Sequence, residues 1–73
     1  MSTLIAAFRK NATEEVRVSV DRYHGHELVN IRVWFTGDDG EMKPGRQGLA
    51  LRLELLPNLR AALDAVGSAH GEG

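Results

Sequence analysis

The segment VRVSVDRYHGHELVNIRVWFTGDDGEMKPGRQGLAL, residues 16–51, carries the pattern on which the architecture depends. Valines alternate with polar residues at its start, and apolar residues occupy the odd positions from residue 29 to residue 35. Alternation with a period of two is typical of strands that have one apolar and one polar face. His24-Gly25-His26 lies between the two runs, so the sequence predicts an antiparallel hairpin closed at this glycine.

A basic, glycine-punctuated ribbon follows the hairpin. Residues 36–40 are turn formers, and residues 42–53 contain no acidic side chain. Pro44 limits any strand in this ribbon to an edge or a bend, because proline donates no ladder hydrogen bond. We therefore predict a short third strand within residues 41–48 and a fourth over residues 49–53.

One helix is predicted after the strands. Its apolar residues recur at three- and four-residue steps and form one stripe: Leu55, Leu56, Leu59, Leu63 and Val66. A start at Leu53 or Glu54 places Pro57 in the first turn, where the missing backbone N–H costs little. Gly67 is the predicted stop.

The chain length allows one small domain. A chain of 73 residues buries only about 60% of the surface that its unfolded form exposes. We expect an N-terminal arm over residues 1–13, the domain over residues 14–67 and a disordered tail over residues 68–73. The predicted fold class is α+β, a four-stranded antiparallel sheet followed by one C-terminal helix, and the broad apolar stripe predicts a homodimer.

Several functional classes are disfavoured by composition. The chain has no cysteine, and His24, His26 and His70 lack acidic neighbours at metal-ligand spacing, so we expect neither a metal site nor a cofactor. No serine, histidine and acid are arranged for catalysis, and we expect no enzyme.

The apolar run from Leu4 to Phe8 is too short to span a membrane. We expect a cytoplasmic, nucleoid-associated protein if the source is bacterial, and a nuclear one if it is eukaryotic.

The charge distribution gives the first indication of a partner. Nine Lys and Arg against ten Asp and Glu give a net charge of −1, whereas nucleic-acid binders are usually basic overall. Lys43, Arg46 and Arg52 nevertheless stand in the ribbon without acidic neighbours, and predict a cationic stripe on a neutral body. The alternative is an ordinary solvated face.

Two aromatic residues are candidate stacking platforms. Trp34 alternates onto the same strand face as Arg32, and an exposed tryptophan beside an arginine suits a nucleobase. Tyr23 alternates onto the polar face of the preceding strand. The competing interpretations are that Trp34 fills the core or a dimer contact, and that Tyr23 caps the hairpin.

Four elements of residues 16–66 resemble the DNA-binding domain of the positive cofactor four family of transcriptional coactivators and its bacterial relatives. They are VRVSVDRYHG, IRVWF, GEMKPGRQG and a final strand that passes into a helix. The resemblance implies a four-stranded antiparallel sheet with a helix, a homodimer packed through the helix and last strand, and sequence-tolerant binding of single-stranded or unwound DNA.

The resemblance also implies a set of site residues. The stacking aromatics of the family fall on Tyr23 and on the pair Trp34 and Phe35. Eukaryotic members stack through the position of Phe35, whereas strand parity favours Trp34 here. Histidines and Gln47 stand where those members have lysines, which implies lower, more pH-dependent affinity. The nucleic-acid-binding residues are thus predicted to be Tyr23, His24, His26, Arg32, Trp34, Phe35, Lys43 and Arg46.

The sequence therefore predicts a protein that binds single-stranded DNA without chemistry, in transcription or genome maintenance. RNA is an alternative strand, and transcription machinery is a candidate protein partner. The competing hypothesis is a protein-interaction module in which the same sheet docks onto transcription machinery. The net charge near zero suits this second hypothesis better.

Overall fold

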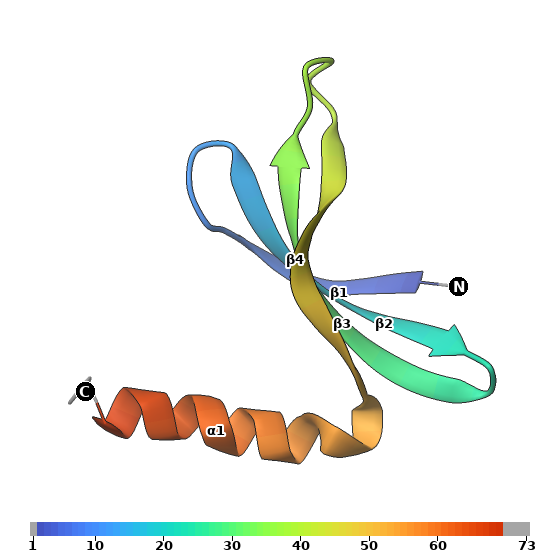
Figure 1. Cartoon of the computed structure of the whole chain (residues 1–73), viewed down its shortest axis with the longest axis vertical. Coiled ribbons are helices and arrows are strands. Elements are labelled where there is room, and N and C mark those ends of the chain that lie inside the picture. The colour runs from blue at the N-terminus through green and yellow to red at the C-terminus, as the bar shows by residue number, and fades with distance from the viewer. Residues whose placement is uncertain (1, 70–73) are drawn as a thin grey trace.

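The computed structural model describes residues 2–69 as one antiparallel sheet followed by a helix (Figure 1). The sheet has four strands in the order β1-β2-β3-β4. The predicted sheet and C-terminal helix are therefore confirmed. The elements are β1 (Ser2–Arg9), β2 (Glu14–Tyr23), β3 (His26–Thr36), β4 (Met42–Arg52), the 3-10 turn η1 (Leu53–Leu55) and α1 (Leu56–Ala69).

The segment predicted as an arm is the edge strand β1. It pairs with β2 along its length, with Phe8 opposite Val16 and Thr3 opposite Val20. The register shifts between Leu4 and Ala6, so Ile5 lies in a bulge that interrupts the alternation of apolar residues. This interruption explains why no strand pattern was visible in the sequence.

The two short strands predicted in the ribbon are one continuous strand, β4. Its register against β3 shifts between Arg32, which is opposite Gly48, and Trp34, which is opposite Pro44. Residues 45–47 therefore face a single β3 residue, and we call this irregularity the β4 break. β4 is an edge strand, as the proline predicted.

The two predicted turns are confirmed. His24 and Gly25 have φ values of 51° and 79°, and positive φ at both central residues matches the twist of a tight hairpin. In the turn between β3 and β4, the Gly37 N–H donates to the Glu41 carbonyl at 2.8 Å. Both turns close antiparallel pairs, and the first of them fixes the unbroken register of β2 and β3.

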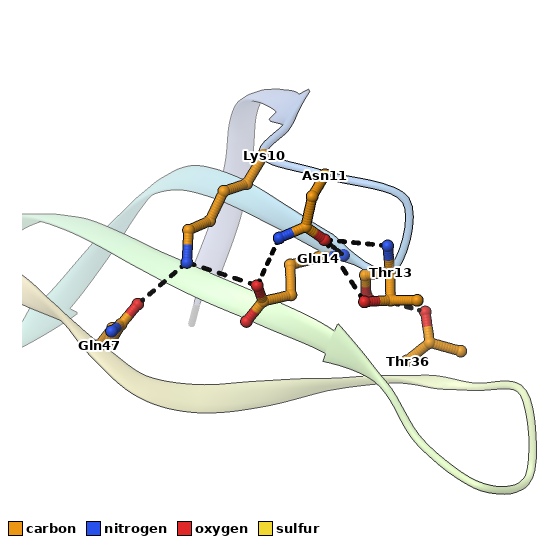
Figure 2. Close-up of polar contacts among 6 residues, drawn as sticks. All are labelled: Lys10, Asn11, Thr13, Glu14, Thr36 and Gln47. Carbon is orange, nitrogen blue, oxygen red and sulfur yellow. Dashed lines mark hydrogen bonds and ion pairs between the residues drawn. The ribbon is translucent and has the colours of Figure 1, made fainter.

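The turn between β1 and β2 is held by the Asn11 side chain (Figure 2). Its Oδ1 accepts from the Thr13 and Glu14 backbone N–H groups at 3.0 and 2.9 Å, and its Nδ2 donates to Glu14 Oε1 at 2.7 Å. The Asn11 amide and the Lys10 ammonium hold the pKa of the Glu14 carboxyl below its ordinary value. The Thr36 N–H donates to the Thr13 carbonyl at 3.0 Å, which ties this turn to β3.

The sheet has one apolar and one polar face, as the alternation predicted. The apolar face carries the cross-strand pairs Val16–Val33, Val18–Ile31 and Val20–Val29, together with Phe35. The polar face carries Arg17, Ser19, Asn30, Arg32 and Trp34. The predicted parity of β3 is confirmed, with Trp34 and Phe35 on opposite faces.

Very little of the chain is buried. Among residues 2–69 only Val29 is a buried hydrophobic residue, with 5% of its surface exposed. The helix α1 leaves the end of β4 and extends away from the sheet (Figure 1), so Leu63 and Val66 remain 59% and 56% exposed. The apolar face of the sheet and the apolar stripe of the helix are therefore not packed against each other.

The helix boundaries differ from the prediction at one end. The 3-10 turn begins at Leu53, and Pro57 lies in the first turn of α1 as predicted. The predicted stop at Gly67 is wrong, because α1 continues to Ala69. A glycine costs a helix only about 1 kcal/mol relative to alanine, so it does not end one alone. The predicted tail is thus helical at residues 68–69, and residues 70–73 lie outside the described part of the chain.

A helix needs about 20 predominantly apolar residues to cross a membrane. Within residues 2–69 no helix is long and apolar enough to cross a membrane.

Candidate nucleic-acid interface

A groove of about 140 Å³ lies on the polar face of the sheet. Two of its residues, Arg32 and Trp34, belong to the predicted site, and their β2 neighbours complete its floor. The lining residues are Ser2, Arg17, Ser19, Asp21, Asn30, Arg32, Trp34 and Pro44. The groove therefore combines two guanidinium groups, an indole and several hydrogen-bonding side chains, which suits a nucleotide.

Arg17 covers one face of the Trp34 ring. Its guanidinium carbon lies 4.3 Å from the ring centroid, within the range of a cation–π contact. Its Nε donates to Glu15 Oε1 at 2.6 Å. Sequence reasoning did not include Arg17 in the site. Counting the register back from the His24-Gly25 turn would have placed it opposite Arg32 and beside Trp34.

The Arg32 side chain on β3 is hydrogen-bonded to the β4 break. Its Nη1 donates to the Gly45 carbonyl at 3.1 Å. A Cβ atom at Gly45 would lie 2.8 Å from the Val33 carbonyl oxygen, so only glycine allows β4 to approach β3 this closely. Arg46 follows directly in the break and is exposed. Arg32 thus positions the backbone that presents Arg46.

The predicted cationic stripe is not a single cluster. Lys43 lies beside the β3–β4 turn, where its Nζ is 3.4 Å from Asp39 Oδ2. Arg52 pairs with Leu28 at the opposite end of β4. The prediction that Lys43 lacks acidic neighbours is therefore wrong, because the turn folds Asp39 back onto it.

The remaining predicted residues lie at the two ends of the sheet. Tyr23 is 63% exposed at the β2–β3 hairpin, with its ring edge-on to His24 at a centroid distance of 4.2 Å, and His26 is exposed beside them. Phe35 lies on the apolar face opposite Lys43 and is 41% exposed. The structure brings Arg32 and Trp34 together on the polar face. The hairpin residues lie at one end of the sheet, and Phe35 and its partner Lys43 lie at the other end on the apolar face.

Lys10 is a second basic residue that sequence reasoning missed. Its Nζ lies 3.4 Å from both Glu14 Oε1 and Gln47 Oε1 (Figure 2). The turn between β1 and β2 therefore brings an ammonium group to the residue that follows Arg46. No pattern in the sequence indicated this contact, because it joins residues 37 positions apart.

The hairpin between β2 and β3 contains two histidines, His24 and His26. Within the described residues, no group of three or more His, Cys, Asp or Glu side chains is arranged to hold a metal ion. His24 lies in the turn between β2 and β3, His26 is the first residue of β3, and both are exposed.

Comparison with known proteins confirms the resemblance suggested by the motifs. Residues 10–62 match the family model of the transcriptional coactivator p15 (PC4). BPSL1147, a PC4 homolog from Burkholderia pseudomallei, is 33% identical, with a TM-score of 0.84 over 92% of this chain and 98% of that chain.

Two more distant structures share the fold. The bacteriophage T5 homolog of PC4, implicated in recombination-dependent DNA replication, is 24% identical, with a TM-score of 0.76 over 96% of this chain and 81% of its own. MoSub1, solved in complex with DNA, is 23% identical, with a TM-score of 0.59 over 88% of this chain and 78% of its own.

Proposed function

The chain belongs to the transcriptional coactivator p15 (PC4) family, and from this premise we propose that it binds single-stranded DNA with little sequence preference, as a homodimer. It acts on unwound DNA in transcription or genome maintenance. The observation that carries the proposal is the polar-face groove, which Trp34 lines together with the arginines of β2 and β3. Aromatic platforms flanked by cations suit strands whose bases are unpaired.

The binding mechanism involves no chemistry. Arg32, Lys43 and Arg46 neutralise phosphates, while Tyr23 and one aromatic of the Trp34–Phe35 pair stack on bases. Lys43 must leave Asp39 to do so, and an exposed ion pair of this kind is worth at most about 1 kcal/mol. Because the contacts are to phosphates and ring faces, RNA is the natural competitor.

The homodimer is proposed from two uncovered apolar surfaces. The helix stripe of α1 and the apolar face of the sheet remain open in a single chain, since the helix extends away from its own sheet. A chain this short gains stability by burying such surfaces against a copy of itself. Two copies of the groove on one dimer would bind a strand at two places.

Known relatives support DNA as the partner. MoSub1 was solved in complex with DNA, and the bacteriophage T5 protein is implicated in DNA replication. Both proteins share the fold of this chain. By extension, the proposal assigns DNA to this chain as its partner. The competing function is the protein-interaction module, which the net charge of −1 and the neutralised Lys43 favour.

A salt titration separates the two functions. Neutralisation of about three to five phosphates predicts a slope of log K against log salt of roughly −2 to −3.5 on a labelled single strand. Changing Lys43 and Arg46 to alanine should flatten the slope by roughly 1.4. The control removes two other arginines, Arg22 and Arg60, and should leave the slope unchanged.

Two outcomes would count against the proposal. Absence of single-strand binding by the wild type at low salt would overturn it and favour docking onto transcription machinery. Equal affinity for a matched duplex would show that unpaired bases are not what the groove recognises.

A further inference from the structure

Two arginines face each other across the polar face of the sheet. Arg17 on β2 and Arg32 on β3 are direct cross-strand partners. Like charges in this position repel each other and destabilise a sheet. Each guanidinium is turned to a different acceptor, Arg17 to the carboxylate of Glu15 and Arg32 to the carbonyl of Gly45. An anion bound in the groove would remove the repulsion.

The groove holds unused hydrogen-bond donors. A guanidinium has five N–H donors, and hydrogen bonds within residues 2–69 occupy one donor of Arg17 and one of Arg32. The Oδ1 of Asn30 is buried there without a hydrogen-bond partner among the described residues, while its Nδ2 lies 3.5 Å from Asp21 Oδ2. The free guanidinium donors suit a phosphate, whereas the covered Asn30 Oδ1 is not accessible to a ligand in this structure.

Arg17 occupies the place that a base would take on Trp34. Its guanidinium lies over the ring, and a base stacked on that ring face must displace it. Cation–π contacts at partly exposed sites are weaker than base–aromatic stacking, so the exchange favours the base. The displaced guanidinium remains on the strand position opposite Arg32, so both side chains are available to one anion.

We propose that the polar-face groove is a nucleotide subsite in which Arg17 exchanges partners. In the free protein Arg17 lies on Trp34 and is paired with Glu15; in the complex the base takes the indole, and Arg17 joins Arg32 on the phosphate. This inference rests on the proposed function and adds Arg17 to its binding residues. Glu15, directly opposite Trp34, competes with the phosphate for Arg17.

The single tryptophan of the chain makes the exchange measurable. Its fluorescence is recorded during titration with oligothymidylate at several salt concentrations, for wild type, Arg17→Gln, Arg17→Lys and Arg22→Gln. Arg22 is the matched control, because it lies on the same strand but on the opposite face and is exposed. Circular dichroism verifies the fold of each variant.

Loss of one phosphate contact sets the expected size of the effect. Arg17→Gln should retain quenching of Trp34 but reduce the salt slope by about 0.7, which corresponds to binding about eightfold weaker at about 50 mM salt and about threefold weaker at about 200 mM. Arg17→Lys should restore the slope, and Arg22→Gln should match the wild type. Glu15→Gln should bind more tightly than the wild type, since Arg17 loses its competing carboxylate.

The outcomes separate the subsite from the proposed function. If the wild type does not bind oligothymidylate, the proposed function fails as well. If the wild type binds and Arg17→Gln has the slope of Arg22→Gln, the subsite alone is refuted. Should Arg17→Gln fail to fold, Glu15→Gln decides, because unchanged affinity in that variant contradicts the competition for Arg17.

Discussion

Truncation of Leu63 tests whether the open helix stripe is a dimer surface. Leu63 is 59% exposed in a single chain. Full burial of a leucine side chain is worth about 1.5–3 kcal/mol, so covering this exposed fraction is worth about 0.9–1.8 kcal/mol for each copy. Two copies contribute to a symmetric interface, and Leu63→Ala should therefore weaken the dimer by about 1.8–3.6 kcal/mol, or roughly 20- to 400-fold in dissociation constant.

Sedimentation equilibrium across a range of concentrations measures this dissociation constant. Asp64→Ala is the control, because residue 64 is polar and lies outside the apolar stripe of the helix. The control should dissociate like the wild type. A wild type that is a folded monomer at micromolar concentration, or a Leu63→Ala variant that dimerises as tightly as the control, would refute the reasoning.

Three further predictions concern the aromatics, the β4 break and the first turn. Trp34→Ala should lower the affinity for single-stranded DNA roughly 5- to 150-fold without changing the salt slope, because stacking is insensitive to salt. Phe35→Ala should instead lower the melting temperature and leave the affinity of the folded protein nearly unchanged. The reverse pattern in titrations and melts would assign stacking to Phe35. Gly48→Ala should destabilise the fold by about 1–3 kcal/mol in urea unfolding, because its Cβ would collide with the Ile31 carbonyl oxygen and lie 2.9 Å from the Arg32 Cα. The control Gly67→Ala, whose Cβ would meet nothing within 4 Å, should stabilise the fold by about 0.5–1 kcal/mol. Equal effects of the two substitutions would contradict the close approach of β4 to β3 at Gly48. Because the pKa of Glu14 is lowered, its ionised carboxylate stabilises the fold at pH values above the ordinary pKa of 4.5, and this contribution is lost as the pH falls below 4.5. The melting temperatures of the wild type and Glu14→Gln should therefore converge in acid. A difference in melting temperature that stays constant with pH would exclude the linkage.

The alternating part of the sequence predicted its structure well, for a physical reason. A two-residue turn at His24-Gly25 fixes the register of β2 and β3, and the valine alternation then determines which residues share a face. Where the alternation is interrupted, the prediction failed. The bulge at Ile5 concealed β1, and the β4 break made one strand resemble two.

The sequence predicted which types of residue form the candidate site better than it predicted the contacts between them. Alternation placed Trp34 and Arg32 on one face, and the structure agrees. The pairing of Lys43 with Asp39 depends on how the turn folds, and the approach of Lys10 to Gln47 depends on tertiary structure. Composition and spacing contain neither kind of information.

The two outer edges of the sheet differ in their capacity to accept another strand. Between Ser2 and Ala7, β1 has neither charge nor proline, and the bulge at Ile5 is its main irregularity. The other edge, β4, carries Pro44, Arg46 and a break in its ladder, which are the features by which natural sheets prevent pairing. Edge-to-edge growth through β1 would therefore end after one step, because a joined pair presents only β4 edges to the solvent.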